Sequence, residues 1–154
     1  MPTFTTRRHV AFTPRQMYDL VADIETYPQF LPLCDDLTVL ARGHDDQGRD
    51  VLTSQMRVGY GAFNERFTTR VTLDPHALAV LAKGNDGPFR HIENTWRLFP
   101  AADGGTDVEF FISYEFANPM LGMLVGSMFD RAFTKFAEAF EQRAEAIYGR
   151  GATT

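Results

Sequence analysis

The polar residues of this sequence show few of the spacings that catalytic sites require. Gly59-Tyr60-Gly61 lacks the third glycine and the following helix of a dinucleotide-binding fingerprint. Gly126-Ser127 lacks the strand and the second glycine of a nucleophile elbow. The sequence therefore predicts neither a catalytic residue nor a metal site. The four histidines have no metal-ligand spacing, and a surface position is expected for each: His9, His44, His76 and His91.

Two polar residues stand out because their neighbours two positions away are apolar. Glu65 lies between two phenylalanines at this spacing, and Asn94 lies between Ile92 and Trp96. Residues two apart share one face of a strand, so both side chains are predicted on apolar faces. A buried carboxylate needs a partner or changes its pKa. Three interpretations of Glu65 stay open. It forms an ion pair with an arginine at the sheet rim, or a bulge turns it to the other face. The third is that it joins Asn94 as a polar contact for a ligand.

The single cysteine, Cys34, is followed by two aspartates and has no basic neighbour in the sequence that would lower its pKa. We interpret it as a small packed residue. One cysteine excludes an intrachain disulfide and a cysteine metal cluster, which suits a reducing compartment.

The bulk properties predict one domain, residues 1–149, followed by a short tail, residues 150–154. A net charge of −5 argues against non-specific nucleic-acid binding, which needs clustered positive charge. The first residues lack the apolar core of a secretory signal, and the longest apolar run, residues 120–129, is too short to span a bilayer. A cytoplasmic location is expected.

The order of the predicted elements indicates an α+β fold. Thr13, Pro14 and Gln16 form a capping box that begins a helix, which Pro28 ends at about Tyr27. The apolar connection 27–34 is predicted to hold a second short helical turn. Short turns separate the strands, which favours an antiparallel meander. The predicted strands are residues 4–10, 37–42, 51–60, 62–73, 78–83, 90–99 and 106–116.

The last segment, residues 118–148, is predicted to form one amphipathic helix of about thirty residues, roughly 45 Å long. Its first two turns are apolar all round, and Gly122 and Gly126 stand where larger residues could pack. We interpret these glycines as leaving room for a ligand. The curved sheet of about seven strands would wrap around this helix, and the aromatic inward faces of the strands suit a large apolar ligand with few polar atoms.

Several stretches resemble the coenzyme Q-binding START-domain family. Residues 27–34, YPQFLPLC, resemble its YPxFLPxC stretch, and residues 87–97 resemble its GPFxxLxxxWxF stretch. The closing strand and helix are also similar, so the resemblance covers nearly the whole chain. One departure is Leu98, which stands where the family has an aromatic residue.

The resemblance implies a helix-grip fold with a lipid site between the sheet and the C-terminal helix. The alternation of side chains along the strands and the resemblance together give the expected ligand-binding residues, with Glu65 and Asn94 as polar contacts. The apolar set is Pro32, Leu33, Met56, Val58, Phe67, Phe89, Trp96, Phe110, Tyr114, Phe116, Leu121, Val125, Met128 and Phe129.

The function that the resemblance implies is binding of ubiquinone or a similar polyprenyl lipid by a non-catalytic carrier or chaperone that supports respiration or quinone synthesis. No catalytic cofactor and no metal are expected. The partners would be the lipid and, transiently, the inner face of the respiratory membrane, whereas nucleic acid and the ribosome are not expected. Two alternatives stay open: an aromatic polyketide cyclase that uses Glu65 or Tyr114 as acid or base, and an interaction module like the ribosome-association toxins.

Overall fold

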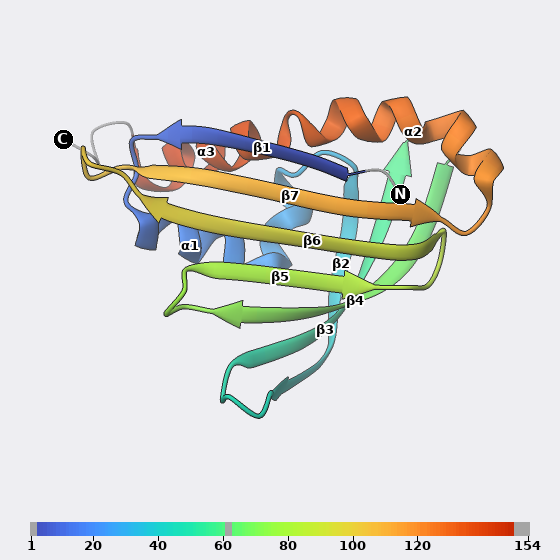
Figure 1. Cartoon of the computed structure of the whole chain (residues 1–154), viewed down its shortest axis with the longest axis horizontal. Helices are drawn as coiled ribbons and strands as arrows, with labels where there is room; N and C mark the ends of the chain where they lie inside the picture. Colours follow the sequence, from blue (N-terminus) through green and yellow to red (C-terminus); the bar gives the residue numbers. More distant parts are fainter. Residues whose placement is uncertain (1–2, 61–62, 150–154) are drawn as a thin grey trace.

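The computed structural model describes residues 3–60 and 63–149 and contains one curved antiparallel sheet with helices on its concave side (Figure 1). The predicted tail, residues 150–154, lies outside the described residues, as does Gly61 of the turn predicted after β3. The strand order is β1-β7-β6-β5-β4-β3-β2. The strands are β1 (Thr3–Val10), β2 (Cys34–His44), β3 (Asp50–Tyr60), β4 (Phe63–Asp74), β5 (Ala79–Gly84), β6 (Phe89–Pro100) and β7 (Thr106–Phe116).

The sheet bends so far that its two halves run in different directions. Strands β1, β7, β6 and β5 lie side by side, whereas the end of β3 and the start of β4 turn up toward helix α2 (Pro119–Phe133) (Figure 1). Phe63, at the start of β4, meets Phe129 of α2 with ring centroids 5.8 Å apart. The α+β helix-grip architecture and the antiparallel meander that the sequence predicts are therefore confirmed.

The first helix, α1 (Pro14–Ala22), begins at the predicted capping box. Thr13 Oγ1 accepts a hydrogen bond from the Gln16 backbone N at 3.1 Å, and the Thr13 backbone N donates to Gln16 Oε1 at 2.9 Å. The predicted end at about Tyr27 was wrong, because α1 stops at Ala22 and a 3-10 segment, η1 (Ile24–Gln29), follows. Pro28 lies inside η1, where it supplies no backbone N–H and disfavours the α conformation of Tyr27.

The predicted single C-terminal helix is two helices, α2 and α3 (Phe136–Tyr148). At the junction, Thr134 Oγ1 donates to the Arg131 carbonyl at 2.7 Å, and the Lys135 backbone N donates to the Ala132 carbonyl at 2.9 Å. Both bonds reach back three residues instead of four, which tightens the turn and interrupts the α-helical ladder. Amphipathic periodicity continues across the junction, so the pattern alone did not reveal the break.

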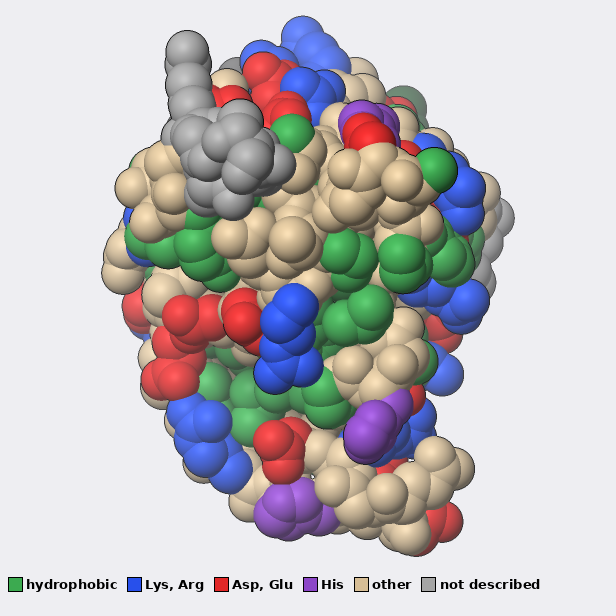
Figure 2. Space-filling view, turned by 90° about the vertical axis from the view of Figure 1, so that its left-hand side faces the viewer, with side chains coloured by type: hydrophobic (Ala, Val, Ile, Leu, Met, Phe, Trp, Pro, Cys, Tyr) green, Lys and Arg blue, Asp and Glu red, His purple; other side chains and the backbone are tan. Residues whose placement is uncertain are grey.

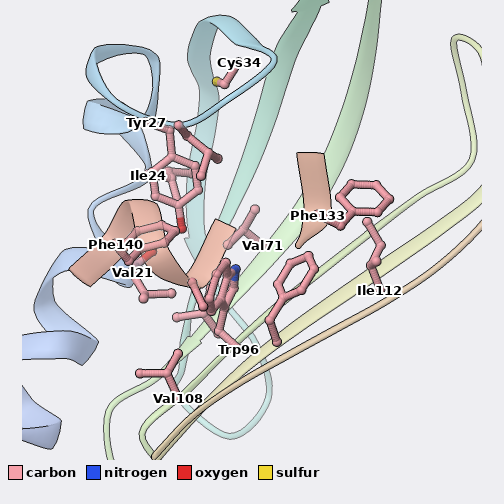
Figure 3. Close-up of a cluster of buried hydrophobic side chains, with 14 of the residues drawn as sticks. Val21, Ile24, Tyr27, Cys34, Val71, Trp96, Val108, Ile112, Phe133 and Phe140 are labelled. Atoms are coloured by element: carbon pink, nitrogen blue, oxygen red, sulfur yellow. The ribbon is translucent and has the colours of Figure 1, made fainter. Parts of the chain in front are cut away.

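The core is a set of aromatic rings between α3 and the sheet (Figure 3). Phe140 of α3 is fully buried, and its ring centroid lies 4.7 Å from that of Trp96 on β6 and 5.4 Å from that of Tyr27 in η1. Trp96 in turn lies 4.7 Å from Phe110 of β7. Phe140 thus joins η1, the sheet and the last helix.

The capping box gives a direct test of how α1 begins. Thr13→Ala removes the acceptor for the Gln16 backbone N, and we expect the free energy of unfolding to fall by about 1 kcal/mol in urea denaturation. Thr13→Ser keeps the acceptor and should stay within a few tenths of a kcal/mol of the parent, roughly the spread among good N-cap residues. Equal losses in both variants would contradict the role of the hydroxyl.

Candidate ligand-binding site

A cavity of about 100 Å³ lies between the concave face of the sheet, η1 and the two C-terminal helices. One water needs about 10–15 Å³ of such space, so the cavity has room for several waters or a small part of a ligand. Its wall is almost entirely apolar. The expected ligand-binding residues that the structure places in this wall are Pro32, Leu33, Met56, Val58, Phe67, Phe89, Trp96, Phe110 and Phe129, together with Asn94.

Five expected ligand-binding residues lie outside the cavity wall, and one of them, Phe116, marks the end of the cavity nearest Gly122 of α2. Phe116 is buried and stacks on Phe89, with ring centroids 5.4 Å apart, and it lies 5.5 Å from Phe129. Because Phe89 and Phe129 line the cavity, these rings form its boundary at this end. The residues outside the wall are Tyr114, Phe116, Leu121, Val125 and Met128.

Gly122 faces this same end, and Gly126 lies about one turn further along α2. A Cβ atom on Gly122 would lie 3.4 Å from the Phe116 ring, whereas one on Gly126 would meet nothing within 4 Å. Neither glycine lies against a strand backbone, and neither lines the cavity. The space beside Gly126 is therefore open, although the enclosed cavity lies further along the helix.

The expected ligand-binding set left out other wall residues. Most of those on the strands share a face with residues of the set, as Ser54 does with Met56, so alternation already predicts them on the inward faces. The wall from η1 and β2 had no such signal, because β2 begins earlier than predicted and its register shifts between Cys34 and Asp36. The missed residues are Ile24, Tyr27, Leu31, Cys34, Leu37, Ser54, Thr69, Val71, Val80, Ala82, Ile92, Ile112, Phe133 and Phe136.

The two predicted polar contacts differ in their placement. Asn94 is partly buried in the wall, and its Nδ2 donates to the Phe111 carbonyl at 2.9 Å. Glu65 is exposed and lies outside the wall, so the expectation that it contacts a ligand in the cavity was wrong. Its partner on the neighbouring strand is Val58, near the end of the β3–β4 hairpin, where a long side chain can still reach water. A carboxylate avoids the cost of desolvation in this way.

The described wall residues include only two titratable groups, Tyr27 and Cys34. Burial raises the pKa of the Cys34 thiol to about 12, and it also raises the pKa of Tyr27, whose hydroxyl donates to the Val21 carbonyl. Both groups are neutral at pH 7. The described wall therefore presents no charge and no group poised to exchange a proton at neutral pH.

Tyr114 of β7 connects the sheet to α2 from outside the cavity. Its hydroxyl donates to Asp130 Oδ1 at 3.1 Å. Burial is the larger cause, and this hydrogen bond the smaller one, that raises the pKa of Tyr114 to about 12. Tyr114 thus holds α2 on the sheet, and it lies outside the wall where an acid or base would meet an enclosed ligand.

The first turns of α2 carry an exposed apolar surface, Met120, Met123 and Leu124, which are 65%, 88% and 75% exposed. An apolar group of this kind on a surface is a common mark of an interaction site. Among the described residues, no helix has the length and apolar character needed to cross a membrane.

Residues 10–141 match the family described as polyketide cyclase/dehydrase and lipid transport. The chain is 29% identical to the ribosome association toxin RatA of Rickettsia prowazekii over 150 residues, covering 96% of this chain and 99% of that protein. It is 32% identical over 146 residues to the mitochondrial coenzyme Q-binding protein COQ10 homolog B of Xenopus laevis. That match covers 92% of this chain and 57% of the other.

Solved structures show the same fold. An 18 kDa protein from Caulobacter crescentus superimposes with a TM-score of 0.79 at 30% identity, covering 97% of this chain and 99% of the other. The Zhui aromatase/cyclase of a Streptomyces species superimposes with a TM-score of 0.77 at 19% identity, covering 94% and 93%. The helix-grip fold, the apolar cavity and the match over residues 10–141 lead to one assignment: the chain belongs to the polyketide cyclase/dehydrase and lipid transport family.

Proposed function

We propose that this protein binds a polyprenyl lipid, ubiquinone or a close analogue, and acts as a non-catalytic carrier or chaperone for it in support of respiration or quinone synthesis. The observation that carries the proposal is the uncharged, largely aromatic cavity between sheet and helices. The similarity to a protein named for coenzyme Q binding supports a quinone as the ligand.

The driving force would be transfer of the isoprenoid tail from water into the protein. Burial contributes roughly 0.8 kcal/mol per CH₂, so a five-carbon isoprene unit would contribute on the order of 3–4 kcal/mol. Aromatic walls such as those formed by Phe67, Trp96 and Phe110 supply close contacts along the tail.

Binding a whole lipid requires the cavity to widen. Pockets that enclose drug-sized ligands measure about 300–1,000 Å³, well above the volume of about 100 Å³ found here. Helix α2 is the element suited to move, because its first turns are largely exposed and Gly126 has open space beside it. Such a movement would open the boundary formed by Phe89, Phe116 and Phe129.

The exposed methionines suggest where the lipid enters. Met120, Met123 and Leu124 would insert into a membrane surface while the adjacent end of the cavity opens, so that the tail passes from bilayer to protein without crossing water. The protein would then act as a peripheral partner of the membrane.

A cyclase activity has less support. The described wall offers no carboxylate, histidine or lysine, and Glu65 and Tyr114, the two candidate acids or bases, lie outside it. General acid–base catalysis needs such a group within hydrogen-bond reach of the substrate.

A second candidate function, association with the ribosome, is favoured by the relatives named ribosome association toxin, which match 96% of this chain. The charge of the chain favours it less. The net charge is −5, and the face in Figure 2 carries acidic and basic side chains interspersed instead of one basic patch. Binding to RNA phosphates depends on clustered positive charge.

Filling the cavity should block the ligand. Ala82 lines the cavity from β5, and Ala82→Met places a longer side chain in that space. We expect the Kd for a short-chain ubiquinone to rise at least about tenfold, or 1.4 kcal/mol. Quenching of the fluorescence of Trp96, the single tryptophan, reports the binding.

The matched control for this variant is Ala79→Met, which adds the same side chain on the opposite face of the same strand. Thermal unfolding of both variants shows whether the fold is kept. Undiminished quinone binding in a folded Ala82→Met protein would contradict the cavity as the site.

Met123→Ser tests membrane contact separately from binding. We expect slower transfer of quinone between vesicles with unchanged affinity for quinone in detergent, because Met123 is 88% exposed and outside the cavity. Ile147→Ser alters an exposed apolar residue near the end of α3 and should leave transfer unchanged. Equal transfer rates in all three proteins would exclude α2 as the docking element.

Co-sedimentation tests the second candidate function. The lipid-carrier proposal expects the purified chain to stay in the supernatant when ribosomal subunits are pelleted at moderate salt. Stoichiometric pelleting that survives added salt would instead favour ribosome association.

A further inference from the structure

Ser54 is a wall residue whose polar group the proposed apolar contacts do not use. It lies on β3, is only 2% exposed and lines the cavity. Within residues 3–60 and 63–149, no donor or acceptor forms a hydrogen bond with its hydroxyl. The one side-chain atom of these residues that is both fully enclosed and without a partner is Arg57 Nε. The Ser54 hydroxyl must therefore open onto the cavity itself.

Thr69 places a second hydroxyl-bearing side chain beside Ser54. The two residues are direct partners across the β3–β4 pair, and both line the cavity. Facing residues on neighbouring strands have Cβ atoms about 4.5–5.5 Å apart, so one small ligand group can lie within reach of both. The next strand carries Ala82 on this side, so a small side chain lines the cavity there.

A buried hydroxyl without a hydrogen bond is destabilising, so this position gains from a ligand oxygen. A serine hydroxyl can donate to a carbonyl and can accept from a hydroxyl. It therefore suits both redox forms of a quinone head group, whose ring oxygens are carbonyls when oxidised and hydroxyls when reduced. Asn94, the other polar wall residue expected to contact a ligand, already donates one N–H of its Nδ2 to the Phe111 carbonyl.

We propose that Ser54, assisted by Thr69, forms the polar subsite that holds a ring oxygen of the ligand's head group against β3 and β4. This inference rests on the proposed function, since it presumes that an apolar ligand enters this cavity. It adds the orientation of that ligand, with the head group bound deep on the sheet and the tail extending along the aromatic wall. It also adds a selectivity: a ligand with an oxygen on its ring is preferred over the corresponding hydrocarbon.

The test compares two ligands that differ in their oxygens, decylubiquinone and decylbenzene, by calorimetric titration in dilute detergent. The proteins are the parent, Ser54→Ala, Thr69→Val and, as control, Thr53→Val, which removes a hydroxyl from the outward face of the same strand. We expect Ser54→Ala to weaken decylubiquinone binding about three- to tenfold, the range for one neutral hydrogen bond. Thr69→Val should weaken it less, and Thr53→Val not at all.

Binding of decylbenzene should be unchanged or tighter in Ser54→Ala, because the variant removes only a polar group. If Ser54→Ala binds decylubiquinone as tightly as the parent does, the subsite is wrong while the cavity remains the lipid site. If the parent binds neither ligand, the proposed function fails, and the subsite fails with it. Thermal unfolding of Ser54→Ala, which is expected to match or exceed the parent, shows that any loss of binding is not a loss of fold.

Discussion

The rest of the structure depends on the packing of Phe140 against Trp96, Tyr27 and Phe30. The centroid of its ring lies 4.7, 5.4 and 5.0 Å from those three rings, and the side chain is fully buried. This cluster fixes α3 on the sheet and also fixes η1, which closes one side of the cavity. On the sheet, Ala82 of β5 contributes a small side chain to the cavity wall. The cavity lies beside this cluster, and the later residues of α2, Phe129 and Phe133, line it together with Phe136 of α3.

The interruption at Thr134 separates two C-terminal helices that pack differently on the sheet. Helix α3 is held by the aromatic core, whereas α2 rests on Phe129, Phe133 and the hydrogen bond from Tyr114 to Asp130. A single rigid helix would have to move as one unit with the core. Under the proposed function, the break would let α2 tilt while α3 remains in place, so that a ligand larger than the cavity could enter.

Sequence patterns predicted most of the fold because strand alternation and turn residues are local signals. The Thr13 capping box and the inward face of β7 follow directly from such signals. The break at Thr134 did not, since its cause is a side-chain hydrogen bond that leaves the apolar period unchanged. The site was predicted less completely. By the alternation of the strand, Glu65 should point inward, but it lies near the end of the hairpin, where its side chain is exposed. Ser54 became informative only once the structure showed that it is buried and that its hydroxyl has no partner.

The proposed function requires that the cavity between sheet and helices carries a lipid quinone. Mass spectrometry of an organic extract of the protein, purified from its own host without added lipid, tests this requirement most directly. We expect a polyprenyl quinone in an amount that approaches one molecule per chain. An extract without lipid, or with a water-soluble compound in its place, would contradict it.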